Sequence, residues 1–260
     1  MIERESILND YYSNYDEDNR LIKNNAHQVE FITTTKYIEK KKKKGDKILE
    51  IGAGTGRYSL YYADKGYDVT AIEYVQSNVD KLKSKIKDTM NIRAEQGDAL
   101  DLSRFNDNAF DITLIFGPLY HLYTEEDIRK AIDEAIRVTK KDGYIYLAYL
   151  TNDAVFLTYF VKRHHLYDKD SYDKNYKLYN KPEKVFSVFY IEEFKNIMKD
   201  YNIEYVSNVA TDGISSILRD YINELNEDEF NVWIDYHLST CEREDLQGYS
   251  NHMLYICKKK

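Results

Sequence analysis

The sequence has 260 residues, and its 37 Lys and Arg against 45 Asp and Glu give a formal net charge of −8. With 43% hydrophobic and 32% charged residues, the composition is that of a globular chain whose length suits one α/β domain with an elaboration. The acidic balance argues against a protein that coats nucleic acid. Because residues 1–20 are polar and no apolar run reaches about 18 residues, we expect a cytoplasmic protein without membrane association.

The first 45 residues are predicted to be largely helical. Apolar and aromatic side chains recur at helical spacing and predict a helix over 7–39. Five lysines at 40–44 and Gly45 follow. We interpret them as a solvated helix end, with cations that complement the helix dipole and Gly45 as the C-cap. The alternative is a patch that binds nucleic acid.

Strands and helices alternate from residue 47 onward. The pattern predicts strands at 48–51, 67–73, 92–96, 110–116 and 143–149, and helices at 56–65, 76–87 and 124–140. This alternation is typical of βαβ units and of a parallel sheet covered by helices on both faces. Beyond residue 150 we expect a helix at 191–201, strands at 203–209 and 253–257, and two insertions at 151–190 and 212–245. Ligands of open α/β sheets lie at the carboxyl ends of the strands, where these insertions would form a cap.

The most informative segment is a glycine loop between the first strand and the following helix. Gly52, Gly54 and Gly56 alternate with small residues, and glycines let the backbone approach a ligand closely. A nicotinamide-dinucleotide loop needs its third glycine at position 57, which is Arg57, and no Lys-Ser/Thr pair follows for a Walker A loop. The spacing, with Glu50 inside the strand, resembles motif I of the class I S-adenosylmethionine-dependent methyltransferases.

Later segments of the sequence resemble further motifs of that family, in the order in which the family has them. Glu73 ends the second strand, 21 residues after Gly52, where a carboxylate accepts hydrogen bonds from ribose hydroxyls. Asp98 and Ala99 follow the third strand, where the family holds the adenine ring. Residues 111–122 and 137–143 are similar to the family's fourth motif and to the approach to its fifth strand.

The resemblance covers about 45–150 and implies an α/β, Rossmann-like fold with a seven-stranded, mostly parallel sheet and an antiparallel last strand. It implies S-adenosyl-L-methionine as cofactor and S-adenosyl-L-homocysteine as product. It further implies one domain over 1–260, with a helical lid at 1–44, a cofactor-binding core at 45–150, and sheet completion with capping insertions at 151–260. The cofactor-binding residues it implies are Glu50, Gly52, Ala53, Gly54, Gly56, Glu73, Tyr74, Asp98, Ala99, Phe116 and Gly117, with Arg20 and Tyr12 from the lid.

Two residues after the fourth strand are candidates for catalysis. His121 has the unperturbed pKa of a general base, although it could instead bond the backbone or help to start the next helix. Tyr120 could position the acceptor or serve as a core aromatic. Arg20 could meet the methionine carboxylate or pair with Asp16 or Asp18 at the surface.

The remaining histidines, tyrosines and cysteines support only less specific predictions. The first insertion could provide an aromatic wall for a cationic amine or be an ordinary amphipathic cap; its candidates are His164, His165, Tyr167, Tyr172, Tyr176 and Tyr179. Cys241 and Cys257 are the only cysteines and support no disulfide framework. The spacing of His237, Cys241 and His252 matches no zinc pattern, so we expect these three residues to be structural, without a metal.

The sequence thus favours methyl transfer to an O, N or C atom of a small molecule, by a monomer or homodimer that binds neither nucleic acid nor membrane. An RNA or ribosomal-component methyltransferase is the first alternative, because of the lysines at 40–44 and 258–260. A non-catalytic protein that binds S-adenosylmethionine is the second. A nicotinamide oxidoreductase comes last, because of Arg57.

Overall fold

The computed structural model of the protein describes residues 4–260. Its centre is a seven-stranded sheet in the order β3-β2-β1-β4-β5-β7-β6. The strands are β1 (Lys47–Ile51), β2 (Asp68–Glu73), β3 (Ile92–Gln96), β4 (Phe110–Ile115), β5 (Thr139–Leu150), β6 (Ile203–Ala210) and β7 (His252–Lys259). β7 runs antiparallel to both β5 and β6, whereas the pairs from β3 to β5 are parallel. The predicted fold is therefore confirmed.

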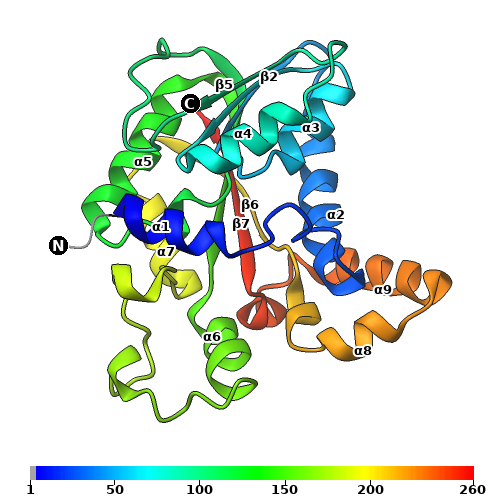
Figure 1. The fold of residues 1–260 in the computed structure, drawn as a ribbon, viewed down its shortest axis with the longest axis vertical. Helices are drawn as coiled ribbons and strands as arrows, with labels where there is room; N and C mark the ends of the chain where they lie inside the picture. Colours follow the sequence, from blue (N-terminus) through cyan, green and yellow to red (C-terminus); the bar gives the residue numbers. More distant parts are fainter. Residues whose placement is uncertain (1–3) are drawn as a thin grey trace.

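Helices cover both faces of the sheet (Figure 1). α2 (Asn25–Glu39), α3 (Arg57–Asp64) and α4 (Gln76–Ser84) lie on one side, and α5 (Glu125–Val138) and α7 (Ile191–Met198) on the other. β1 and β4 are almost completely buried, as expected for strands of a sheet covered on both faces. No helix within residues 4–260 is long and apolar enough to cross a lipid bilayer.

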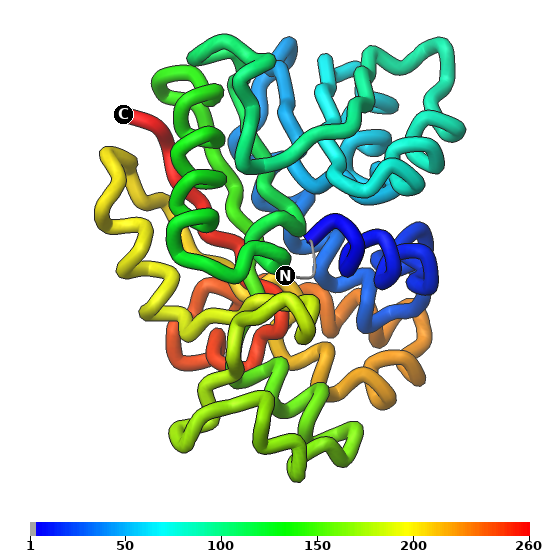
Figure 2. Tube along the Cα trace, turned by 60° about the vertical axis from the view of Figure 1, so that its left-hand side comes forward, coloured from blue at the N-terminus to red at the C-terminus, as the bar shows by residue number. Residues whose placement is uncertain are grey.

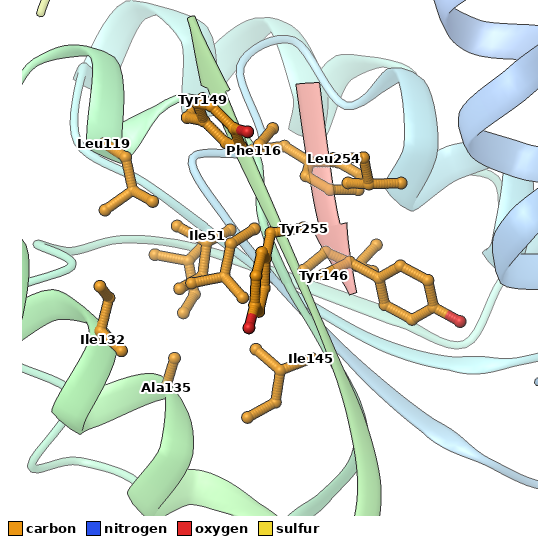
Figure 3. Packing of buried hydrophobic residues seen from close by; sticks show 14 of the residues in the cluster. Ile51, Phe116, Leu119, Ile132, Ala135, Ile145, Tyr146, Tyr149, Leu254 and Tyr255 are labelled. Atoms are coloured by element: carbon orange, nitrogen blue, oxygen red, sulfur yellow. The ribbon is translucent and has the colours of Figure 1, made fainter. Parts of the chain in front are cut away.

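The core forms where β5 and β7 meet the helices (Figure 3). Ile132 and Ala135 of α5 pack toward the sheet, and Tyr146 and Tyr149 of β5 are completely buried. The ring of Tyr149 stacks on Phe194 of α7 with centroids 4.1 Å apart. This packing holds the strands rigidly, so their carboxyl ends offer fixed positions for functional side chains.

The predicted continuous helix over 7–39 is wrong, because the chain forms two helices, α1 (Arg4–Ser13) and α2. The segment between them is rich in Asn and Asp, whose side chains bond the local backbone instead of extending a helix. Asn14 donates to the carbonyl of Asp10 at 3.0 Å, and Asn24 caps α2 by accepting from the His27 N–H at 3.3 Å. Residues 1–3 of the predicted lid lie outside the described residues.

α2 ends at residue 39, as predicted, but its C-cap is not Gly45. Its last residue is Glu39 and its C-cap is Lys40, so Gly45, with a φ of 88°, belongs to a later turn. Lys40 lies over the Tyr37 ring and Lys42 pairs with Glu39 at 2.9 Å. These lysines are therefore engaged with the protein's own surface.

The two insertions form a cap below the sheet in the view of Figure 1. The first contains α6 (Asn152–Val155), which continues as a π-helix over Phe156–Val161. The second contains α8 (Arg219–Glu224) and α9 (Glu227–Thr240). Figure 2 shows the N-terminal helices between the strand–helix core and this cap.

Candidate active site

A cavity of about 840 Å³ lies at the carboxyl ends of the parallel strands. One half is lined by the loops after β1, β2, β3 and β4, and the other half by the cap. Residues of α1 and of the segment that follows it line the cavity as well. The position agrees with the general location of ligands in open α/β sheets.

The three glycines of the loop after β1 have different environments. A Cβ on Gly52 would lie 2.5 Å from the Phe116 carbonyl oxygen, and a Cβ on Gly56 would lie 2.1 Å from Leu82. Both positions therefore require glycine for internal packing. Gly54 has a φ of +53° and lines the cavity, and its nearest neighbour would be Glu17 at 3.4 Å. Gly56 is not among the residues that line the cavity.

Glu73 is a buried carboxylate at the carboxyl end of β2. Its Oε2 accepts the Gly54 N–H at 2.8 Å, and its Oε1 accepts the Val75 N–H at 2.9 Å. Burial raises the pKa of Glu73. Since each carboxylate oxygen has two lone pairs, Glu73 can still accept one bond at each oxygen from a pair of ligand hydroxyls.

Glu50 lies inside β1, beneath the glycine loop. It accepts a hydrogen bond from the Ser59 hydroxyl. Burial raises the pKa of Glu50 to about 8, so the carboxyl group is largely protonated at neutral pH and can donate as well as accept.

Asp98 and Tyr74 form the wall of the cavity beside β2 and β3. Asp98 pairs with Arg4 of α1, and the Arg4 guanidinium lies 4.4 Å from the centre of the Tyr74 ring. The other Asp98 oxygen accepts the Leu100 N–H at 3.0 Å. Ala99, Ala53, Phe116 and Gly117 line the same half of the cavity.

His121 connects the lid to the cap. Its Nδ1 lies 2.9 Å from the Val185 carbonyl oxygen, and its Nε2 lies 2.9 Å from the Tyr12 hydroxyl. Because a carbonyl only accepts, Nδ1 carries the proton and Nε2 accepts from Tyr12. Burial lowers the pKa of His121 to about 4, so this ring is neutral at physiological pH.

Arg20 lines the cavity and has partners other than the expected Asp16 or Asp18. Its Nε lies 3.2 Å from Glu17, and one terminal nitrogen lies 2.8 Å from Oε2 of Glu30. The same Glu30 oxygen lies 3.5 Å from Nδ1 of His252. A cluster of partly buried charged groups therefore extends from the lid to the last strand.

Sequence reasoning missed the residues that end this cluster. Asp212 follows β6, His252 begins β7, and the His252 Nδ1 lies 3.1 Å from Oδ2 of Asp212. The antiparallel direction predicted for the last strand could have indicated the pair, because it brings the start of β7 to the carboxyl edge of the sheet. Glu30 lies in no sequence motif that would have indicated a functional residue. Tyr120 lies between the two histidines, with its ring 6.3 Å from His121 and 6.0 Å from His252.

Most of the predicted aromatic wall lies elsewhere. Tyr179 lines the cavity, whereas Tyr167 is 93% exposed and His164, His165 and Tyr176 are exposed as well. Tyr172 packs against Phe156 and Phe160 inside the cap. The lid also contributes aromatic side chains to the cavity lining, where Tyr11 stacks on Tyr15 with ring centroids 5.3 Å apart.

The site fits a nucleoside-containing ligand. Glu73 has free lone pairs for two vicinal hydroxyls, Asp98 stands one strand further along for a base amino group, and Gly54 leaves room between them. The volume lies in the range of about 300–1,000 Å³ that is usual for small-molecule sites. Fold and donor set together define a nucleoside-binding α/β protein.

Comparison with known proteins narrows this class. Residues 49–147 match the family model described as "Methyltransferase domain". The chain is 38% identical over 114 residues to a demethylmenaquinone methyltransferase of Paenarthrobacter aurescens, covering 44% of this chain and 42% of that protein. It is 28% identical over 134 residues to a glycine/sarcosine N-methyltransferase of Aphanothece halophytica, covering 50% of this chain and 51% of that protein. It thus spans about half the length of these curated relatives or less.

Solved structures share the whole architecture. A possible histamine N-methyltransferase from Thermotoga maritima superimposes with a TM-score of 0.59 at 18% identity, covering 99% of this chain and 100% of that one. An S-adenosylmethionine-dependent methyltransferase from Methanosarcina mazei superimposes with a TM-score of 0.57 at 20% identity. The match covers 86% of this chain and 96% of that one. Residues 49–147 are thus similar to a methyltransferase domain, and the fold of the chain is shared with S-adenosylmethionine-dependent methyltransferases.

Proposed function

We propose that this protein transfers a methyl group from S-adenosylmethionine to an O, N or C atom of a small-molecule acceptor. The observation that carries the proposal is the continuity of the cavity, which joins the Glu73 and Asp98 carboxylates to a second half enclosed by both insertions and α1. The curated relatives named above support it, because the names of both describe methyl transfer to a small molecule.

Within this proposal the first half of the cavity binds the methyl donor. Glu73 accepts from the ribose hydroxyls, Asp98 accepts from the adenine amino group, and the backbone around Gly54 lies against the methionine portion. Arg20 lines the cavity from the lid, and it exchanges Glu17 or Glu30 for the methionine carboxylate. When bound, the donor supplies an electrophilic methyl carbon at the border between the two halves.

The second half orients the acceptor and excludes water. Placing two reactants in line and away from solvent contributes roughly 7–11 kcal/mol in well-aligned reactions. Tyr120, buried beside both histidines, is the side chain that we expect to position the acceptor. His121 has both ring nitrogens occupied, so it acts as a base only after Tyr12 moves away.

A small-molecule acceptor is favoured over RNA by the position of the basic residues. Lysines 40–44 precede β1, which begins at Lys47, whereas the cavity lies at the carboxyl end of this strand. The lysine run therefore lies at the opposite edge of the sheet from the proposed site. The polar residues 1–20 and the absence of a long apolar run in the sequence remain the basis of the accompanying prediction of a cytoplasmic protein, and a monomer or homodimer stays a prediction.

Calorimetric titration with S-adenosylhomocysteine tests this proposal, with NADH as the control ligand. We expect binding of S-adenosylhomocysteine alone. Transfer of a labelled methyl group to small amines and phenols then tests catalysis. Binding without transfer to any acceptor favours the non-catalytic alternative, and no binding of S-adenosylhomocysteine refutes the assignment of the glycine loop.

A further inference from the structure

The fold brings an aspartate and a histidine together at the carboxyl edge of the sheet. β6 ends at Ala210, which pairs with Met253 of the antiparallel β7, and His252 pairs with Leu150 at the end of β5. Asp212 and His252 therefore meet where the parallel strands open into the cavity, and both line it.

Asp212 is held in one orientation by several donors. Its Oδ1 accepts the Ser250 hydroxyl at 2.8 Å and the His252 backbone N–H at 3.0 Å, and its Oδ2 accepts the Ser216 hydroxyl at 2.7 Å. The remaining partner of Oδ2 is Nδ1 of His252, at 3.1 Å. Burial alone would raise the pKa of Asp212, but the bonds from His252 and Ser216 outweigh it and lower that pKa.

This arrangement fixes the tautomer of His252. A carboxylate only accepts, so Nδ1 carries a proton and Nε2 is the basic nitrogen. Within residues 4–260 Nε2 has no hydrogen-bond partner, and the side chain is 18% exposed, with the ring lining the cavity. A base oriented by a carboxylate, with its second nitrogen directed to a ligand site, is the general pattern of an activated acid–base pair.

Three charged groups and one phenol surround His252. Glu30 on α2 lies 3.5 Å from Nδ1, Arg20 precedes α2, Asp212 follows β6, and Tyr120 packs against the ring. Burial by itself lowers the pKa of His252, but the Glu30 and Asp212 carboxylates outweigh it and raise that pKa above 6.5. The raised pKa makes His252 a stronger proton acceptor than a free imidazole, as a general base requires.

We propose that His252, oriented by Asp212, removes the proton from the acceptor, so that the acceptor is a hydroxyl or amine that keeps its proton at neutral pH. This inference rests on the proposed function. The acceptor X–H gives its proton to Nε2 while its lone pair forms the X–CH₃ bond. The electron pair of the broken methyl–sulfur bond stays on sulfur, and His252 then releases the proton to solvent.

Two variants test the role of His252 as the base and the role of Asp212 as its orienting group separately. His252→Asn keeps an amide N–H that can donate to Asp212 but lacks Nε2, and Asp212→Asn removes the carboxylate. The matched controls are His165→Asn and Asp235→Asn, because both residues are exposed and do not line the cavity. Binding of S-adenosylhomocysteine and thermal unfolding are measured for each variant, so that damage to the fold or to the donor half is recognised separately.

The assay measures transfer of a labelled methyl group to catechol and benzylamine, which keep a proton, and to pyridine, which has none to lose. We expect turnover of catechol or benzylamine, with kcat/KM rising as pH increases through the pKa of His252. His252→Asn lowers kcat/KM by about 10²- to 10⁴-fold, with little change in S-adenosylhomocysteine affinity. Asp212→Asn moves the rise in kcat/KM to lower pH, since the imidazolium loses its carboxylate partner.

Three results would overturn the inference. His252→Asn could methylate catechol and benzylamine at the wild-type rate with an unchanged pH profile. Pyridine could be the only acceptor, or no acceptor could be methylated by a protein that binds S-adenosylhomocysteine. Failure to bind S-adenosylhomocysteine at all is a different outcome, which overturns the proposed function itself and this inference with it.

Discussion

Replacement of Gly54 by leucine tests whether the glycine loop faces the methyl donor. Gly54 has a φ of +53°, and its added Cβ would make only an ordinary contact with Glu17 at 3.4 Å. The backbone conformation costs a non-glycine residue about 1–2 kcal/mol. The rest of the leucine side chain extends into the cavity, beside the Gly54 N–H that Glu73 accepts. We therefore expect a modest loss of stability and a large loss of binding.

Gly66→Leu is the matched control, because Gly66 has a φ of +83° and a Cβ there meets nothing within 4 Å. Both variants should unfold at similarly reduced temperatures. Calorimetry should show at least about a 100-fold weaker affinity for S-adenosylhomocysteine in Gly54→Leu, which equals about 2.7 kcal/mol, and unchanged affinity in Gly66→Leu. Wild-type affinity in a folded Gly54→Leu protein would refute the placement of the donor beside this loop.

Three further predictions concern charge. Burial raises the pKa of Glu50 from 4.5 to about 8, so the stability that its protonation provides is complete below pH 4.5 and is lost as pH rises toward 8. Glu50→Gln should therefore gain stability over the wild type by a few kcal/mol more at pH 8.5 than at pH 5, and equal pH profiles in thermal unfolding would contradict the shift. Arg4→Ala should bind S-adenosylhomocysteine about 2- to 5-fold more tightly, because the partly exposed Arg4–Asp98 pair, worth about 1 kcal/mol, no longer competes with the ligand. Weaker binding in calorimetry would instead make Arg4 part of the binding site. RNA-affinity chromatography at about 50 mM salt should leave the protein in the flow-through, because the lysines at 40–44 lie away from the cavity; retention that weakens steeply with salt would support the RNA alternative.

The alternation of strands and helices was predictable because each core element carries its own periodic signal. β3 has the predicted bounds, and most other strands differ from prediction by a few residues. The continuous helix over 7–39 was wrong for a local reason. Its apolar spacing continued in phase across Asn14 and Asn24, while the side-chain bonds of these residues to the backbone compete with the helix.

The two halves of the site differ in how far the sequence predicts them. Gly52, Gly54, Glu73 and Asp98 lie at the end of a strand or within a few residues after it, so one motif per strand end is enough to identify them. Asp212 and His252 are 40 residues apart, and each alone looks like an ordinary residue of an insertion or a strand. Only the antiparallel pairing of β6 with β7 makes them neighbours.

The lid connects these two halves through a single helix. Arg4 pairs with Asp98 in the nucleoside half, and Tyr12, two turns further along α1, donates to His121 in the acceptor half. Because one rigid helix makes both contacts, a ligand that displaces Arg4 from Asp98 acts on the same element that occupies Nε2 of His121. Within the described chain, His252 has no hydrogen bond or ion pair with α1. Its ring is oriented by Asp212, which follows β6, and its other partner is Glu30 of α2, which also pairs with Arg20. The geometry therefore separates a histidine whose Nε2 is occupied by α1 from one that a carboxylate at the sheet edge keeps oriented, and the second is better suited to act as the base.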